Sequence, residues 1–431
     1  MSLNRRLTKY CSNKKIAVFI FILALIIGSA GYLKFAHIPV EGDALEFKEL
    51  GKKVASGSWT TSQDFGYVRT PGYPIILGTI YATLGSNDLY VKFAQVILFS
   101  IIAVIIYFIG NMMFSWLVGL LSAIWYITYY DFVRIAYLLL REIWITFFIL
   151  LILLFFILYI NKHKLNYIIL GSLSFGCLIM IDPRYSFFLF ILIGFGLFFS
   201  TDWLHKARDL IIIISGLMVF LIPWSVHQSR THNEFILFSP IRDAEILSFL
   251  GTNHIYIHEE NKYYPFDMQK EDYVKDLAES GLSSSKKKEI ERLLTDEYIQ
   301  ELRSRIPQNK IKIYLHRFHD YWRFAQLKIG VGAGNDVRFR FPWSLSKNLN
   351  NIIHIGFLLP FILTGIYLIF KKRQLLQLLI LCLLAYHMLF HIVVHYLYRY
   401  RYPILPILFL VGWYGVDTIA HGIFKEMGDR N

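Results

Sequence analysis

The sequence is poor in cysteine, in charged residues and in the motifs of soluble enzymes. Its three cysteines, Cys11, Cys177 and Cys382, lie far apart in 431 residues. This spacing indicates neither a disulfide framework nor a cysteine metal knuckle. The sequence also contains no P-loop lysine motif and no GxSxG motif. It therefore does not predict a nucleotide-phosphate loop or a serine-hydrolase elbow.

Apolar residues are abundant instead. Hydrophobic residues make up 55% of the chain, aromatic residues 17% and charged residues only 17%. A soluble domain cannot bury that much apolar surface and still present enough polar groups to water. Repeated apolar stretches of about 20 residues are what the hydrocarbon core of a bilayer requires of spanning helices. The composition therefore predicts an integral membrane protein.

The apolar stretches predict an all-α polytopic membrane protein with about ten transmembrane helices. The expected spans cover residues 16–36, 89–110, 114–131, 140–160, 165–182, 185–200, 209–228, 352–370, 375–396 and 402–421. The first span shows no signal-peptide cleavage pattern, and we expect it to remain as an anchor.

The spans divide the chain into three predicted parts. Residues 1–228 form a transmembrane catalytic module of about seven spans, with an amphipathic first extracytoplasmic loop at 37–88. Residues 229–350 form one larger extracytoplasmic segment. Residues 351–431 form a C-terminal module of about three spans.

The net charge is +13, but the cations do not predict a nucleic-acid partner. They fall in short clusters beside hydrophobic segments, as topology-setting residues and lipid contacts do. The basic N-terminal flank and the basic loops at 162–164, 206–208 and 371–373 predict one common, cytoplasmic side. Both termini are therefore expected in the cytoplasm, with 37–88 and 229–350 on the outside of the cell or inner membrane.

Two carboxylates stand out because charged groups near a bilayer cost free energy. Asp43 follows the first span and shares a helix face with Glu46. One interpretation is a capping box, in which Asp43 caps a helix that begins at Ala44; the other is a catalytic site. Glu142 follows Arg141 at the start of the fourth span. It either forms an interfacial pair with that arginine or faces Asp43 across a cavity. Asp131 and Arg134, in the same short connection, could substitute for Glu142 in that role.

Arginines lie at the outward ends of several spans. Guanidinium groups favour phosphate through planar, charge-assisted hydrogen bonds, whereas single arginines at such positions also snorkel to lipid headgroups. The candidate phosphate-binding residues are Arg69, Tyr73, Arg184, Arg399 and Arg401. A histidine stripe, His387, His391 and His395, favours packing inside the bundle over a metal site, because no acid lies on that helix.

Five segments in this order resemble the GT-C superfamily of membrane glycosyltransferases. The similar branch contains the protein O-mannosyltransferases and the aminoarabinose transferases of lipid A. The segments are EGDALEF, RTPGYPIILGTIYATLG, LLLREIWITFFILL, the stretch that begins PWSVHQSR, and RYRYPILPILFLVGW. The chain departs from the mannosyltransferases at Glu142, where they have aspartate, and in HQSR, which replaces an arginine–asparagine pair.

The resemblance implies a glycosyltransferase that moves a sugar from a polyprenyl-phosphate donor to an extracytoplasmic protein, lipid or envelope glycan. Asp43 would be the catalytic carboxylate and Glu142 its partner. One base suffices, because the phosphate leaving group needs no general acid. Attack from the face opposite the phosphate would invert the configuration of the anomeric carbon. A divalent cation held by Asp43 and Glu142 is a further candidate. The alternatives are a flippase of lipid-linked glycans and a non-catalytic assembly partner with the same fold.

Overall fold

The computed structural model describes most of the chain but not all of it. The described residues are 14–35, 39–40, 42–58, 70–199, 202–232, 235–237, 254–257, 262–265, 315, 318, 321–322, 352–393 and 398–428. Most of the predicted 229–350 segment and Arg69 therefore lie outside the described residues.

Helices make up nearly all of this part of the chain. They are α2 (Lys14–Phe35), α3 (Asp43–Ala55), α4 (Gly72–Leu84), α5 (Asp88–Met113), α6 (Trp116–Thr128), α7 (Tyr130–Ile135), α8 (Glu142–Lys162), α9 (Leu165–Ile181), η2 (Pro183–Phe187), α10 (Phe188–Phe199), α11 (Trp203–His232), η3 (Ile352–Gly356), α17 (Leu359–Lys372), α18 (Leu375–Val393), η4 (Tyr398–Ile404) and α19 (Leu405–Gly428). Strands β1 (His254–Ile257) and β2 (Lys262–Pro265) form a short antiparallel pair that joins His254 to Pro265 and Ile257 to Lys262.

The helices confirm a polytopic all-α membrane protein. Six of the described helical segments are long and apolar enough to cross a membrane: α2, α5, α8, α11, α17 together with the preceding η3, and α19 together with the preceding η4. Five shorter apolar helices accompany them, and four of these (α6, α9, α10 and α18) coincide with predicted spans. The fifth, α4, falls in the predicted first loop. The number of crossings, about ten, stays a prediction.

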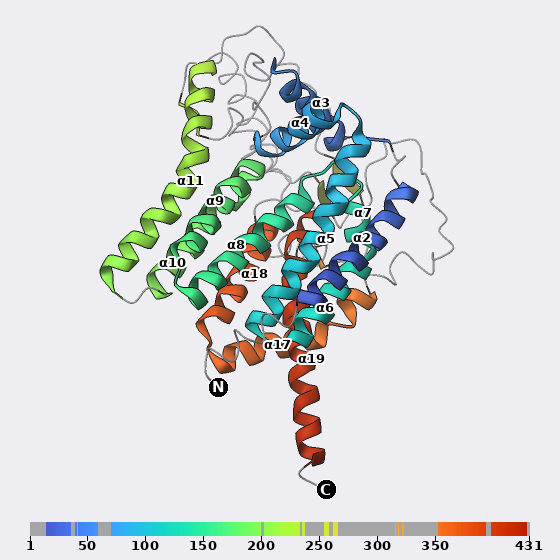
Figure 1. Ribbon diagram of the computed structural model, residues 1–431, viewed down its shortest axis with the longest axis vertical. Helices are drawn as coiled ribbons and strands as arrows, with labels where there is room; N and C mark the ends of the chain where they lie inside the picture. Colours follow the sequence, from blue (N-terminus) through green and yellow to red (C-terminus); the bar gives the residue numbers. More distant parts are fainter. Residues whose placement is uncertain are drawn as a thin grey trace.

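The long helices form a bundle, and α3 and α4 lie together across one end of it, at the top of Figure 1. Helix α8 packs between α9 and α5, and α9 packs in turn against α11. The C-terminal part of α19 projects from the opposite end of the bundle (Figure 1). Helix α8 also contacts η4, which lies near the end of the sequence.

Close backbone contacts between helices explain two of the glycines. A Cβ on Gly110 of α5 would lie 2.5 Å from the Cα of Gly119 on α6, and a Cβ on Gly119 would lie 2.4 Å from the carbonyl oxygen of Tyr107. Small residues at such crossings let membrane helices approach closely, because helices in lipid associate through packing rather than through the hydrophobic effect.

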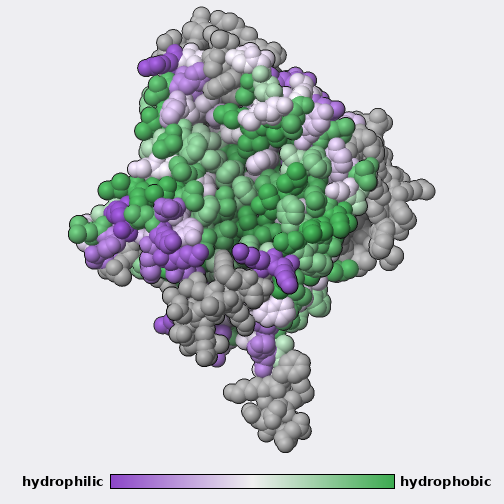
Figure 2. Space-filling view, in the orientation of Figure 1, coloured by the Kyte–Doolittle hydropathy of each residue, from purple (hydrophilic) through white to green (hydrophobic). Residues whose placement is uncertain are grey.

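The surface agrees with a lipid-facing bundle. In Figure 2, hydrophobic residues dominate the middle of the visible face, and hydrophilic residues gather toward its upper and lower margins. Large apolar side chains that a water-soluble protein would bury are exposed, among them Phe19, Phe190 and Ile211. Lipid tails provide the apolar surroundings that these side chains require.

Candidate functional site

Asp43 is the first residue of α3, at the end of the bundle where α3 and α4 lie. The capping-box interpretation is wrong in this structure. Gly42 occupies the N-cap position with a φ of 57°, a conformation that favours glycine, and no side chain caps the helix. The Asp43 carboxylate instead makes a contact outside its own helix.

Glu142 is the first residue of α8 and also lies in a first helical turn. Its side chain is only 3% exposed. One carboxylate oxygen, Oε2, is buried without a hydrogen-bond partner in the described part of the chain.

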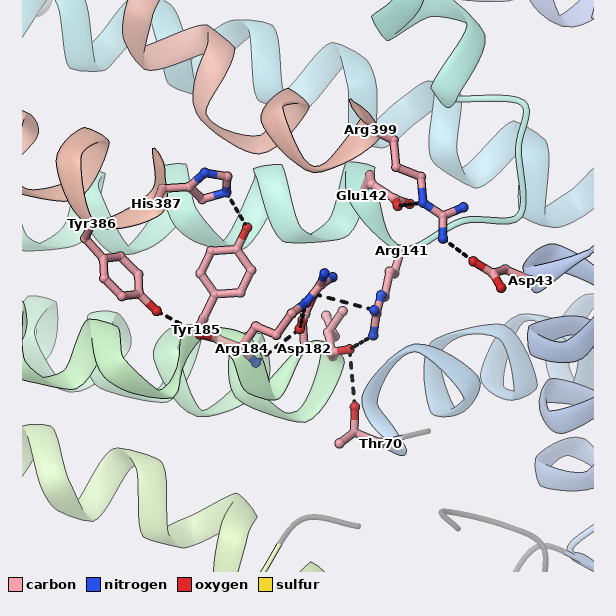
Figure 3. Close-up of polar contacts among 11 residues, drawn as sticks. Asp43, Thr70, Arg141, Glu142, Asp182, Arg184, Tyr185, Tyr386, His387 and Arg399 are labelled. Atoms are coloured by element: carbon pink, nitrogen blue, oxygen red, sulfur yellow. Dashed lines mark hydrogen bonds and ion pairs between the residues drawn. The ribbon is translucent and has the colours of Figure 1, made fainter. Parts of the chain in front are cut away.

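Arg399 joins these two carboxylates (Figure 3). Its Nη2 donates a hydrogen bond to Oδ2 of Asp43, and its Nε lies 3.0 Å from Oε1 of Glu142. Arg399 belongs to η4, which leads into α19. The guanidinium thus connects residues from three distant parts of the sequence. We call Asp43, Arg399 and Glu142 the carboxylate clamp.

A second ionic cluster lies beside the clamp, at the junction of α9 and η2. Arg184 donates from Nε to both oxygens of Asp182, at 2.8 and 3.1 Å. Arg141, the residue before Glu142, places Nη2 at 3.7 Å from Asp182 and donates from Nη1 to the Ile181 carbonyl. Arg141 and Glu142 are neighbours in the chain, so the two clusters share one backbone segment.

The electrostatics of Asp182 follow from this arrangement. Burial alone would raise its pKa, but the guanidinium groups of Arg141 and Arg184 have the larger combined effect, and the pKa of Asp182 lies well below its usual range. Asp182 therefore remains a carboxylate near neutral pH and keeps both arginines in place.

Tyr400 connects the two clusters. Its ring lies 3.7 Å from the guanidinium carbon of Arg184 and 5.7 Å from that of Arg399. Cation–π contacts of this kind are favourable when the cation is partly removed from water. Asp182 holds Arg184, and Asp43 and Glu142 hold Arg399. Neither arginine's Nη1 has a hydrogen-bond or ion-pair partner within the described ranges. Each guanidinium thus retains donors for an incoming anion.

The first residue of α4 packs closely against the end of α9. A Cβ on Gly72 would lie 2.5 Å from the carbonyl carbon of Met180, so only glycine fits there without a shift. Thr70 donates its hydroxyl hydrogen bond to the Ile181 carbonyl at 3.3 Å. Thr70 and Gly72 are therefore packed against the backbone that precedes Asp182.

Other predicted site residues lie elsewhere. Tyr73 is fully buried and donates to Gln95, which itself donates to the Leu138 carbonyl at 2.6 Å. Arg401 is also fully buried and donates to the Tyr321 carbonyl at 3.1 Å. Both side chains support the fold beneath the site in this structure, and neither is placed to receive a phosphate. Arg69 lies outside the described residues.

Asp131, the proposed substitute for Glu142, points into the protein. It accepts hydrogen bonds from the hydroxyl groups of Tyr402, at 2.7 Å, and Tyr129, at 3.4 Å. Burial raises the pKa of Asp131, and the hydrogen bonds and the cations Arg401 and Arg134 only partly offset that effect. Glu142, not Asp131, is the carboxylate that shares a cation with Asp43.

The histidine stripe is used for hydrogen bonding, as the packing interpretation expects. The two ring nitrogens of His387 lie 2.9 Å from the Tyr185 hydroxyl and 3.1 Å from the Tyr321 hydroxyl. His391 packs against His387 and Tyr400. His395 lies outside the described residues. Among the residues that the structure describes, no three His, Cys, Asp or Glu side chains are grouped to hold a metal ion.

Sequence reasoning missed Asp182, Arg141 and Tyr400 as members of the site. Asp182 carried a usable signal, because a carboxylate at the end of an apolar span followed by proline and arginine is costly unless it is paired. Arg141 and Tyr400 carried none, because each gains its contacts only through the packing of distant helices.

Comparisons with known proteins find relatives of the fold but none of the sequence. No family model matches the sequence, and no curated protein matches it. Solved structures do match the fold. The aminoarabinose transferase ArnT from Cupriavidus metallidurans, bound to undecaprenyl phosphate, aligns with a TM-score of 0.58 and 11% identity over 93% of this chain and 60% of its own.

The archaeal oligosaccharyltransferase AglB from Archaeoglobus fulgidus is a second neighbour. Its complex with an inhibitory peptide and a dolichol-phosphate aligns with a TM-score of 0.57 and 14% identity, over 97% of this chain and 52% of its own. A complex of the same archaeal protein with zinc and sulfate gives a TM-score of 0.56 at 12% identity, over 94% of this chain and 49% of its own. The present chain thus spans about half to three-fifths of the length of these neighbours, and at this identity the likeness establishes the fold.

Proposed function

We propose that this protein is a membrane glycosyltransferase that moves a sugar from a polyprenyl-phosphate donor to an acceptor outside the cytoplasm. The carboxylate clamp carries the proposal. It combines a partly exposed carboxylate, Asp43, whose side chain is 32% exposed, with a guanidinium that keeps Nη1 available to a phosphate. The neighbours with this fold bind undecaprenyl phosphate and dolichol phosphate, which supports a lipid-phosphate donor here.

Asp43 is the proposed general base. An acceptor hydroxyl attacks the anomeric carbon of the donor sugar, and Asp43 takes the hydroxyl proton as the new carbon–oxygen bond forms. The bond between the anomeric carbon and the phosphate oxygen breaks, and its electron pair leaves with the phosphate. Attack from the face opposite the phosphate inverts the configuration at that carbon.

Arg399 and Arg184 are the proposed phosphate ligands. Donors fixed before the reaction stabilise the charge that develops on the leaving phosphate, and they do so without reorganisation during the step. Asp182 and Glu142 hold these arginines in place. Arg69, which precedes the Thr70 contact with Ile181, remains a candidate for the same phosphate.

The apolar bundle supports a donor whose lipid tail stays in the bilayer while its head group reaches the α3 end. We propose the α3 end as the extracytoplasmic face of the cell or inner membrane, in agreement with the basic loops expected on the other side. The acceptor is a protein, a lipid or an envelope glycan. Residues 1–228, 229–350 and 351–431 would then be the catalytic module, an extracytoplasmic segment and a C-terminal membrane module.

The test is release of free polyprenyl phosphate, the product common to every acceptor. The purified full-length protein in detergent is incubated with a panel of polyprenyl-phosphate sugars and an envelope acceptor fraction, and the lipid product is measured by mass spectrometry. We expect release that depends on both protein and acceptor. A flippase or an inactive assembly partner would release none, because detergent leaves no second compartment and neither breaks the sugar–phosphate bond.

A further inference from the structure

Arg399 occupies the position between Asp43 and Glu142 where a divalent cation is the alternative candidate. Its Nη2 contacts Oδ2 of Asp43 and its Nε lies 3.0 Å from Oε1 of Glu142. A guanidinium keeps its charge at every accessible pH. A metal ion bound by the same two oxygens would lie directly beside this positive charge. The guanidinium and the metal therefore exclude each other at this position.

The remaining ligands do not fit a metal either. A hard divalent cation takes about six oxygen ligands from protein and water. The clamp leaves one buried oxygen without a hydrogen bond, Oε2 of Glu142, on a side chain that is 3% exposed. Across the described ranges, no third carboxylate, histidine or cysteine joins the pair.

Arg399 is also suited to remain in the clamp during a reaction. Two of its three nitrogens face the carboxylates, and Nη1 has no ion pair in the part of the chain that can be described. The planar group can therefore hold Asp43 and Glu142 with one edge and donate to a phosphate from the other. Glu142 acts through Arg399, which makes it a positioning residue.

We infer that Arg399 is the fixed cation of this site and that sugar transfer needs no divalent metal. The statement about transfer rests on the proposed function. The statement about metal binding does not, because it concerns only the contacts of Arg399.

The statement about metal binding is tested by titrating the full-length protein in detergent with Mn²⁺. Free Mn²⁺ is followed by electron paramagnetic resonance. The wild type and Glu142→Gln are expected to behave alike, with no Mn²⁺ site that depends on Glu142. A stoichiometric site in the wild type that disappears in Glu142→Gln would overturn the inference. This measurement needs no donor, acceptor or activity.

The statement that sugar transfer needs no divalent metal is tested by measuring the release of polyprenyl phosphate. After dialysis against EDTA, release is expected to stay within about twofold of the untreated protein, because the developing charge is met by Arg399. Loss of release that Mn²⁺ or Mg²⁺ restores would overturn the inference. If the wild type releases no polyprenyl phosphate under any condition, the proposed function fails while the Mn²⁺ titration remains readable.

The role of the charge at position 399 is tested by comparing the release of polyprenyl phosphate by Arg399→Gln and Arg399→Lys. Arg399→Gln is expected to lose release by about a hundredfold or more, the usual cost of removing a fixed donor to a developing anion. Arg399→Lys is expected to retain more activity than Arg399→Gln, still without a metal requirement.

The control is Lys52→Ala, which removes a cation from an exposed pair with Glu49 on α3 and should leave release unchanged. Equal activity of Arg399→Gln and the wild type would contradict the role of Arg399. If Arg399→Gln does not fold, Arg399→Lys with and without EDTA decides the question.

Discussion

The two ends of α8 carry carboxylate–guanidinium groups of the same chemistry but different construction. At the start of α8, Glu142 meets Arg399 and Asp43, which come from distant segments and leave Asp43 partly exposed. Near the end of α8, the Tyr159 hydroxyl donates to Asp209 at 2.7 Å, and the adjacent Arg208 contacts both groups. Asp209 is fully buried.

This difference distinguishes the proposed site from a structural contact. The Asp209 group is made largely of sequence neighbours, is closed by a tyrosine and leaves its carboxylate inaccessible. The clamp holds a carboxylate that a substrate can reach and a guanidinium with a spare donor. Access and unused hydrogen-bonding capacity, rather than the presence of an ion pair, therefore distinguish the proposed functional end of this bundle.

The largest expected effect is that of Asp43→Asn on sugar transfer. Asparagine keeps the size of the side chain but cannot accept a proton, so release of polyprenyl phosphate should fall about a hundredfold to ten-thousandfold. The thermal midpoint in detergent should change little, because Asp43 is partly exposed. A variant that transfers sugar at the wild-type rate would show that Asp43 is not the base.

The next effect is that of Asp182→Asn on stability. The substitution leaves Arg141 and Arg184 without their common carboxylate. Removal of one partner of a buried ion pair typically costs about 3–5 kcal/mol, so the thermal midpoint should fall clearly near neutral pH.

The same variant gives a pH test with a defined sign. The pKa of Asp182 is lower in the folded protein than in the unfolded chain. Its stabilising effect is therefore complete above the unfolded pKa of about 4 and is lost as the pH falls through the folded value. The difference in midpoint between wild type and Asp182→Asn should be constant at mildly acidic to neutral pH and should narrow only in strong acid. A difference that instead narrows as the pH rises toward neutrality would contradict this assignment.

The smallest expected effect is that of Asp209→Asn, the counterpart at the other end of α8. Loss of the charge-assisted hydrogen bonds should lower the free energy of unfolding by about 1–3 kcal/mol. Transfer per folded molecule should stay at the wild-type rate, because Asp209 lies far along α8 from the clamp. If transfer fell as far as in Asp43→Asn, the distinction between the two ends would fail.

Much of the fold could be predicted from the sequence, because the bilayer imposes a length and a composition on every span. Asp43, Glu142 and Arg399 were also predicted as site residues, since charges at the ends of spans are conspicuous. Their contacts could not be derived. Arg399 and Arg401 stand two residues apart in the same short helix, yet one reaches the carboxylates and the other is buried against Tyr321. Only the packing of η4 decides which arginine faces which way.

Tyr73 and Asp43 illustrate the same limit. The tyrosine in RTPGYP was grouped with phosphate ligands, but its hydroxyl donates to buried Gln95. The carboxylate of Asp43 was compatible with a helix cap, but the helix begins with Gly42 as its cap and Asp43 turns to Arg399. Both outcomes depend on helices that are remote in sequence, and local patterns carry no information about them.

The central claim is that Asp43 and Arg399 meet at one end of the bundle, and cysteine cross-linking tests it most directly. In a background without native cysteines, the Asp43→Cys/Arg399→Cys pair is treated with a short bifunctional thiol reagent. The control is Asp43→Cys/Lys162→Cys, because Lys162 lies at the far end of α8, about 30 Å from Glu142 at 1.5 Å per residue. We predict an intramolecular cross-link in the first pair and none in the control. No cross-link in the first pair, or equal cross-linking in both, would contradict the account.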